Sequence, residues 1–259
     1  MIDAVLFDGD QTLWDFEKVM RVALEAALVE LRMARPGTRA DSLQIADLQA
    51  DRSDVARELE GVEYNLARLR RLGFARSLRR LEGEHGDHGD HGDHGDHGDH
   101  EDSLGAWIDD DALAAQLTAT YFAQRDRDPA LFDDTLPCLE ALRPDYRLGL
   151  LSNGSRLPEV IGLSGFFEAV VFAQDHNVAK PDRGIFVVAE TLLRVAPDST
   201  VLVGDHPLND VVGAKRAGWR AVWIDRQGDG SFPSPAGTDE RPDAIITSLA
   251  QLPGMLATL

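Results

Sequence analysis

The sequence predicts an α/β protein: a Rossmann-like, doubly wound parallel sheet core with an inserted all-helical domain. Short apolar runs alternate with helical patterns from residue 129 onward, and one further apolar run stands alone at the N-terminus. The stretch between them has helical spacing throughout. This β-α alternation is typical of parallel sheets with helical crossovers, and 259 residues are enough for such a core and a second, smaller domain.

The first apolar run, residues 4–7, lacks the polar alternation of a half-exposed strand and indicates a strand buried on both faces. The following block has apolar residues at helical spacing and no convincing strand. It predicts helices at 16–35, 48–59, 62–81 and 110–124. Pro36 and Gly37 are expected to end the first of these helices.

The remaining part alternates between the two patterns. It predicts strands at 148–151, 169–172, 201–203, 221–224 and 244–246, and helices at 158–163, 184–195, 208–217 and 248–252. Gly218 stands where a left-handed helix cap is expected, and Pro253 is expected to end the last helix. We therefore predict an α/β core from residues 1–14 and 129–259, and a helical domain over 15–128.

Composition limits the partners and the compartment. A formal net charge of −19 makes nucleic acid and anionic membranes poor partners, and no apolar run is long enough to span a bilayer. The single cysteine, Cys138, excludes an internal disulfide and is expected to be a small buried hydrophobe. The N-terminus does not read as a signal peptide. We expect a soluble, cytoplasmic protein, for which a homodimer is possible.

The strongest motif is a pair of aspartates, Asp8 and Asp10, directly after the first strand. Residues two apart at a strand end can face one crevice, and open α/β sheets bind ligands at that edge. Two such carboxylates repel each other unless a hard cation lies between them, and oxygen ligands favour Mg²⁺. The alternative is an ordinary turn with solvated aspartates.

Three further motifs follow later strands. The tripeptide Ser152-Asn153-Gly154 has a hydroxyl and backbone N–H groups that can hold phosphate oxygens, although it is also a common turn. Lys180 precedes Pro181, which disfavours a helical conformation, but a single lysine is usually a surface residue. Asp205 follows a strand, and Asp210 stands in the first turn of the next helix, where an anion is favoured.

Together and in this order, the four motifs resemble those of the haloacid dehalogenase (HAD) superfamily. The matching features are Asp-x-Asp-x-Thr, a serine ending the second core strand, a lysine, and Gly-Asp-x-x-x-Asn-Asp. The resemblance covers residues 1–14 and 129–259, and the inserted helices look like the C1 cap of that superfamily. Such a cap would close over substrate, exclude water and set specificity.

The resemblance implies a role for each motif residue. Asp8 would be the nucleophile that forms an aspartyl-phosphate, and Asp10 the general acid and then the base. Thr12 would stabilise the loop and orient Asp10. The phosphoryl oxygens would be bound by Ser152, the backbone amide of Asn153, and Lys180. Mg²⁺ would be held by Asp8, the backbone carbonyl of Asp10, and Asp205. Asp210 would support this set or hold Lys180.

The implied function is Mg²⁺-dependent hydrolysis of a small phosphorylated metabolite, of the nucleotide or sugar phosphate type. The alternatives are a phosphomutase, a non-catalytic binding protein and a dehalogenase. Dehalogenases of the superfamily lack the second aspartate and use no metal, so Asp10 favours phosphoryl chemistry. The chain departs from the common pattern at Gln11, where many relatives have glycine, and at Gly9, which is expected to leave room near the leaving group.

Three weaker signals have plain structural interpretations. Six arginines crowd one predicted helix: Arg68, Arg70, Arg71, Arg76, Arg79 and Arg80. A solvated helix face is favoured over recognition of a second anionic group on the substrate. A low-complexity His-Gly-Asp loop at 85–102 offers histidines but no spaced metal ligands. Trp14 is expected to pack at the hinge of the cap rather than against substrate.

Overall fold

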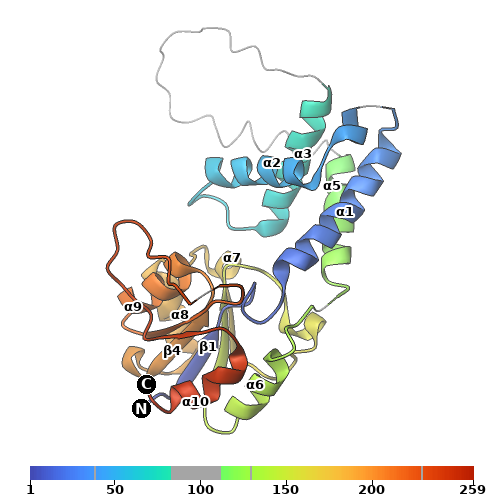
Figure 1. Cartoon of the computed structure of the whole chain (residues 1–259). Helices are drawn as coiled ribbons and strands as arrows, with labels where there is room; N and C mark the ends of the chain where they lie inside the picture. The colour runs from blue at the N-terminus through green and yellow to red at the C-terminus, as the bar shows by residue number, and fades with distance from the viewer. Residues whose placement is uncertain (38, 83–111, 129, 229) are drawn as a thin grey trace, which may run out of the picture. The chain divides into compact units, whose positions relative to one another are not determined.

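The structure is a computed structural model that describes residues 1–37, 39–82, 112–128, 130–228 and 230–259. The chain forms two compact units, shown in Figure 1. We call Met1–Val19 with Asp126–Leu259 the core unit, and Met20–Arg125 the helical unit. The low-complexity loop expected at 85–102 lies outside the described residues.

The core unit contains one sheet of six parallel strands in the order β3-β2-β1-β4-β5-β6. Its strands are β1 (Ala4–Phe7), β2 (Arg147–Ser152), β3 (Ala169–Phe172), β4 (Thr200–Gly204), β5 (Arg220–Ile224) and β6 (Ala244–Ile246). The chain builds outward from β1 on one side and then returns to its other side for β4. This order confirms the predicted doubly wound sheet, and its switch point between β1 and β4 is where such sheets bind ligands.

Both faces of the sheet are covered, which explains why β1 is apolar along its whole length. Val5 and Phe7 point to the face covered by α6 (Thr135–Leu142) and α10 (Leu252–Leu256). Ala4 and Leu6 point to the opposite face, covered by α8 (Arg183–Leu193) and α9 (Gly213–Arg216). Alternate side chains of one strand thus belong to two separate cores.

Two helices of the core unit differ from expectation because of proline. Helix α6 was not predicted, and it contains Pro137 in its first turn. Pro253 was expected to end the last helix, but this prediction is wrong, because α10 continues beyond it to Leu256. In the first turn of a helix the missing N–H of proline costs no hydrogen bond.

The remaining connections of the core unit are short. They are η2 (Pro158–Ile161), α7 (Ala173–His176), η3 (Pro197–Ser199), η4 (Pro207–Val212) and η5 (Leu249–Gln251). The helix expected at 208–217 is a π-helical turn, η4, followed by α9. Gly218 has φ +81° and donates its N–H to the carbonyl of Lys215, which confirms the expected left-handed cap.

The described part of the helical unit contains no strand, as expected. It consists of α1 (Phe16–Ala34), η1 (Arg39–Ser42), α2 (Ile45–Glu58), α3 (Leu66–Glu82) and α5 (Ala112–Arg125), with the first residues of α1 counted in the core unit. Leu24, Leu31, Phe74 and Leu117 lie in its own apolar core. None of the described helices is both long enough and apolar enough to cross a bilayer.

Candidate active site

The buried ammonium of Lys180 lies at the centre of the site, beyond the carboxyl ends of β1, β2 and β4. Its Nζ donates to Asp8 Oδ1 at 2.6 Å, Asp210 Oδ1 at 2.7 Å and the Leu151 carbonyl at 2.8 Å. An ammonium has three donors, so the protein uses all of them. Burial disfavours its charged form, but Asp210 and Asp8 outweigh this effect and raise the pKa of Lys180 above its ordinary value. The side chain is therefore a cation at neutral pH.

A cluster of carboxylates surrounds this cation. Asp8, Asp205 and Asp210 each place one oxygen within 4.8 Å of the others. Burial raises the pKa of Asp8 well above its ordinary value, with Lys180 opposing, and burial followed by repulsion from Asp210 raises the pKa of Asp205 to about 7. Three carboxylates around one ammonium leave an excess of negative charge. An oxygen-only donor set with this excess fits a hard divalent cation such as Mg²⁺.

Asp210 links two parts of the site. Its Oδ1 accepts the hydrogen bond from Lys180, and its Oδ2 accepts one from the backbone N–H of His206 at 2.9 Å. A Cβ on Gly204 would lie 2.4 Å from Asp210 Cγ, so only glycine allows the carboxylate to approach the end of β4 this closely. Asp210 therefore belongs to the carboxylate cluster with Asp8 and Asp205. The metal ligands expected from the sequence included the backbone carbonyl of Asp10 and did not include Asp210.

The segment after β2 holds the backbone of Lys180 through Asn153, and it contains Ser152. The Asn153 side-chain amide donates to the Lys180 carbonyl and accepts from the Lys180 N–H, both at 2.9 Å. It thereby clamps the backbone before Pro181, a contact that sequence analysis missed. Ser152 Oγ accepts the N–H of Gly154 at 2.9 Å. Phosphate binding by this segment stays a prediction.

Asp10 is held by a residue that was not assigned to it. The Trp14 Nε1–H donates to Asp10 Oδ1 at 2.7 Å. Thr12 Oγ1 is buried and finds no hydrogen-bond partner within the described ranges, so its hydroxyl does not orient Asp10 here. A Cβ on Gly9 would lie 2.3 Å from the indole ring. The expectation that Gly9 leaves room near the leaving group is therefore wrong, because Trp14 fills that space.

Gln11 has a structural explanation. Its φ of 58° lies in the left-handed region, which favours glycine and costs another residue roughly 1–2 kcal/mol. Its Oε1 accepts the N–H of Phe16 at 3.1 Å, and Asp15 Oδ1 accepts the N–H of Lys18 at 2.9 Å. These bonds satisfy N–H groups at the start of α1, which offsets part of the cost.

A cavity of about 490 Å³ lies beside Asp205 in the core unit. Its wall includes Gln11, Phe132 and Arg226. Arg226 donates to both carboxylate oxygens of Asp134 at 3.0 Å, and also to the Thr12 carbonyl at 2.6 Å. A cavity of this size can accommodate a small metabolite.

Cys138 is excluded as a nucleophile. It is buried in α6, and burial raises the pKa of its thiol to about 12. A thiol with this pKa is almost entirely protonated at neutral pH and is a poor nucleophile. The expectation of a small buried hydrophobe is confirmed.

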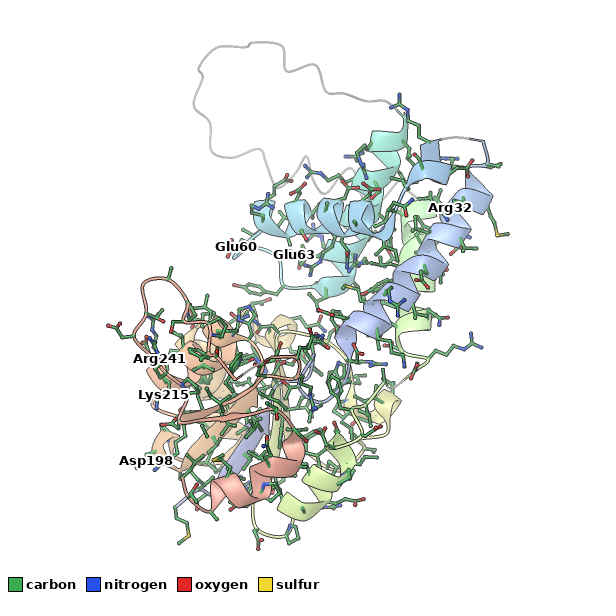
Figure 2. All side chains as sticks on the ribbon, viewed as in Figure 1. Arg32, Glu60, Glu63, Asp198, Lys215 and Arg241 are labelled. Carbon is green, nitrogen blue, oxygen red and sulfur yellow. The ribbon has the colours of Figure 1, made fainter. Side chains whose placement is uncertain are left out.

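Four of the six arginines of α3 show two kinds of environment. Three pair with carboxylates, as a solvated face requires: Arg68 with Glu63 at 2.7 Å, Arg76 with Glu58 at 2.6 Å and Arg80 with Asp51 at 2.8 Å. Glu63 is labelled in Figure 2. Arg70 is different, because it is buried and its guanidinium lies 4.4 Å from the centre of the Tyr121 ring. The solvated-face interpretation therefore does not describe Arg70.

Comparison with known proteins defines the family. A sequence model described as haloacid dehalogenase-like hydrolase matches residues 2–218. The match covers more than half of the chain, and the fold and the motif order agree with it. The chain therefore belongs to the haloacid dehalogenase-like hydrolase family.

Individual relatives are similar over different lengths. Phosphoserine phosphatase of Thermus thermophilus is 36% identical over 120 residues, which is 44% of this chain and 47% of that protein. N-acylneuraminate-9-phosphatase of Mus musculus is 33% identical over 50% of this chain and 53% of its own length. The chain thus spans about half the length of these two relatives. A 5-amino-6-(5-phospho-D-ribitylamino)uracil phosphatase of Escherichia coli is 28% identical over 98% of this chain and 96% of its own length.

Solved structures with the same fold include more than one chemistry. A 2-haloacid dehalogenase from Pseudomonas syringae has a TM-score of 0.73 and 29% identity, covering 100% of this chain and 99% of its own. A HAD phosphatase from Thermococcus onnurineus has a TM-score of 0.55 and 26% identity, with 98% of both chains covered. Since one fold carries both chemistries, the site residues have to distinguish them.

Proposed function

We propose that this protein is a Mg²⁺-dependent phosphohydrolase that cleaves phosphomonoesters of small metabolites through an aspartyl-phosphate on Asp8. The observation that carries the proposal is the carboxylate cluster of Asp8, Asp205 and Asp210 around a single cation, Lys180. An excess of buried carboxylates suits a divalent cation and the anionic substrate that it accompanies. Asp10, the second aspartate of the first motif, lies beside this cluster and supplies the acid that a phosphatase needs.

The chain's own residues account for two chemical steps. Lys180 holds Asp8 Oδ1, which leaves Oδ2 to attack phosphorus. A bond forms between Asp8 and phosphorus while the bond to the leaving oxygen breaks, and Asp10 donates a proton to that oxygen. Asp10 then takes a proton from water, which attacks the same phosphorus, releases inorganic phosphate and restores the Asp8 carboxylate.

The residues that would hold Mg²⁺ are Asp8, Asp205 and the backbone carbonyl of Asp10, with Asp210 beside them. When bound, Mg²⁺ supplies positive charge that offsets the repulsion between the Asp8 carboxylate and the phosphoryl group. Ser152, the backbone amide of Asn153 and Lys180 are proposed to face the phosphoryl oxygens.

The substrate class is proposed from the relatives. The names of the three curated relatives refer to phosphomonoesters of small metabolites, and we extend only this class to the present chain. A helical unit inserted after β1 is proposed to act as a cap that excludes water and selects among such substrates.

The test is phosphate release from p-nitrophenyl phosphate and from a panel of metabolite phosphates, with Mg²⁺ and with EDTA. Asp8→Asn removes the nucleophile and should reduce kcat by at least about a thousandfold. Asp198→Asn is the matched control, because Asp198 is exposed in η3, before the amino end of β4, and should keep wild-type activity.

Three results would contradict the proposal. Activity that survives Asp8→Asn would exclude Asp8 as the nucleophile. Phosphoryl transfer between two positions of one substrate, without phosphate release, would identify a mutase. Halide release from 2-haloacids without metal would identify a dehalogenase.

A further inference from the structure

We propose that Trp14 is a positioning residue that holds the carboxyl group of Asp10 in one orientation. The proposal rests on the phosphatase function above, in which Asp10 is the general acid. It is carried by one hydrogen bond, from Trp14 Nε1 to Asp10 Oδ1 at 2.7 Å. Trp14 is 0% exposed, so water does not compete for this bond.

The chemistry of the indole fixes one oxygen of Asp10. An indole N–H is a donor only, so Asp10 Oδ1 is the acceptor of this bond. The bond therefore limits rotation of the carboxyl group about its Cβ–Cγ bond.

Asp10 Oδ2 lies close to the segment that is proposed to bind the phosphoryl group. A Cβ built on Gly154 would lie 3.0 Å from Asp10 Oδ2 and 3.1 Å from Ser152 Oγ. Glycine at position 154 therefore lets both side chains lie against the same stretch of backbone. With Oδ1 held by the indole, this orientation keeps Asp10 beside the proposed phosphoryl-binding segment.

The indole itself is held in place from several sides. Its ring packs against the Cα of Gly9, where any larger residue would displace it. The guanidinium of the buried Arg156 lies 6.0 Å from the ring centre. The Trp14 carbonyl accepts the backbone N–H of Gln11 at 2.8 Å. The donor that orients Asp10 is therefore part of the packed core.

The kinetic test separates acid catalysis from general damage. Trp14→Phe keeps an aromatic ring but removes the donor. We expect kcat for alkyl phosphate monoesters to fall about tenfold or more, because an alkoxide leaving group needs the proton. For p-nitrophenyl phosphate, whose leaving group needs little protonation, kcat should change less than about threefold, and KM should stay unchanged for both.

Trp219→Phe is the matched control. Trp219 is 2% exposed and donates its Nε1–H to Glu190 Oε1 at 2.7 Å, so the same chemical change occurs away from the site. It should lower both activities equally or not at all. Gly9→Ala, which displaces the indole without altering it, should reproduce the loss selective for alkyl phosphates. Equal losses on both substrates for Trp14→Phe would overturn the proposal.

A readout independent of activity is the indole N–H region of a ¹H–¹⁵N spectrum, which should contain the signals of four tryptophans. The Trp14 signal, identified by its loss in Trp14→Phe, should shift in Asp10→Ala and stay in place in Asp198→Asn. A Trp14 signal that does not respond to Asp10→Ala would overturn the proposal. If the bond is present but the wild-type protein hydrolyses no ester, the phosphatase function fails and Trp14 loses this role with it. If hydrolysis is intact and the losses are uniform, only the role of Trp14 fails.

Discussion

Each unit contains buried cations, and Lys180 in the core unit and Arg70 in the helical unit have their charges balanced in opposite ways. Lys180 in the core unit is 4% exposed and donates to two carboxylates. Arg70 in the helical unit is 7% exposed and stacks on Tyr121, and within the described ranges it forms no ion pair with a carboxylate. Burial lowers the pKa of Arg70, and it also lowers the pKa of the nearby Arg52, to which Arg70 adds repulsion.

The comparison shows what each unit lacks. Around Lys180, carboxylates outnumber the cation, so the core unit is suited to a further positive charge. Around Arg70, an aromatic ring compensates the buried charge only in part, and the nearby Arg52 adds repulsion between cations. The charge of Arg70 is therefore less well balanced than that of Lys180. Recognition of a second anionic group on the substrate stays a prediction for Arg70, and the following predictions test both halves of the comparison.

Removal of the balanced cation should have the largest effect. Lys180→Met leaves Asp8 and Asp210 buried without their partner, so we expect kcat to fall by at least about a thousandfold and stability to fall by about 3–5 kcal/mol. Lys215→Met is the control, since Lys215, labelled in Figure 2, pairs with Asp243 at 2.7 Å and is less buried. Lys215→Met should lower the free energy of unfolding, measured by urea denaturation, by at most about 1 kcal/mol. Similar losses in both variants would show that Lys180 is only a structural ion pair.

The carboxylate excess should make metal binding depend on pH. The pKa of Asp205 is raised to about 7, so the folded state holds this proton more tightly than the unfolded chain does. The contribution of Asp205 to the stability of the metal-free protein is complete below about pH 4 and is lost as pH rises through about 7. Mg²⁺ needs the carboxylate form, so below pH 7 its apparent affinity should fall by up to about tenfold per pH unit.

This dependence is measured as the Tm increase caused by Mg²⁺ at pH 6 and at pH 8. The increase should be larger at pH 8, and Asp205→Asn should abolish the difference. An equal increase at both pH values in the wild-type protein would exclude Asp205 as the titrating ligand.

Substitution of Arg70 should have the smallest effect of these changes. Arg70→Met keeps an apolar stem of similar length, and we expect KM to rise about tenfold for phosphate esters that also carry a carboxylate. KM for p-nitrophenyl phosphate should not change. Arg76→Met, which removes a partly exposed arginine paired with Glu58, is the control and should change neither value. An equal rise in KM for both esters would show that Arg70 serves packing alone.

Much of the fold was accessible from the sequence because the strands are short, apolar and bounded by turn residues. Strands β1, β3 and β6 begin and end at the predicted residues. The missed helix α6 begins with Thr-Leu-Pro, where proline in the first turn obscures a helix that is only two turns long. Local pattern does not show whether a proline starts a helix or ends one.

The candidate site was predictable in its residues but not in its contacts. Asp8, Lys180, Asp205 and Asp210 follow strands of one sheet, so topology alone brings their backbones to one edge. The Asn153 clamp on Lys180 and the bond from Trp14 to Asp10 depend on side-chain rotamers and long-range packing, which no local pattern contains. Gly9 was the available signal, since an unusual glycine between two aspartates indicates that something large lies against it.

The close packing of Gly9 against Trp14 has a consequence for how this protein can be redesigned. Any side chain larger than hydrogen at position 9 displaces the indole, and a smaller residue at position 14 leaves a hole over the glycine. The effects of substitutions at the two positions are therefore coupled, and a single substitution at either one should lower activity. Libraries that vary both positions together should recover active sequences that two separate saturation scans would discard.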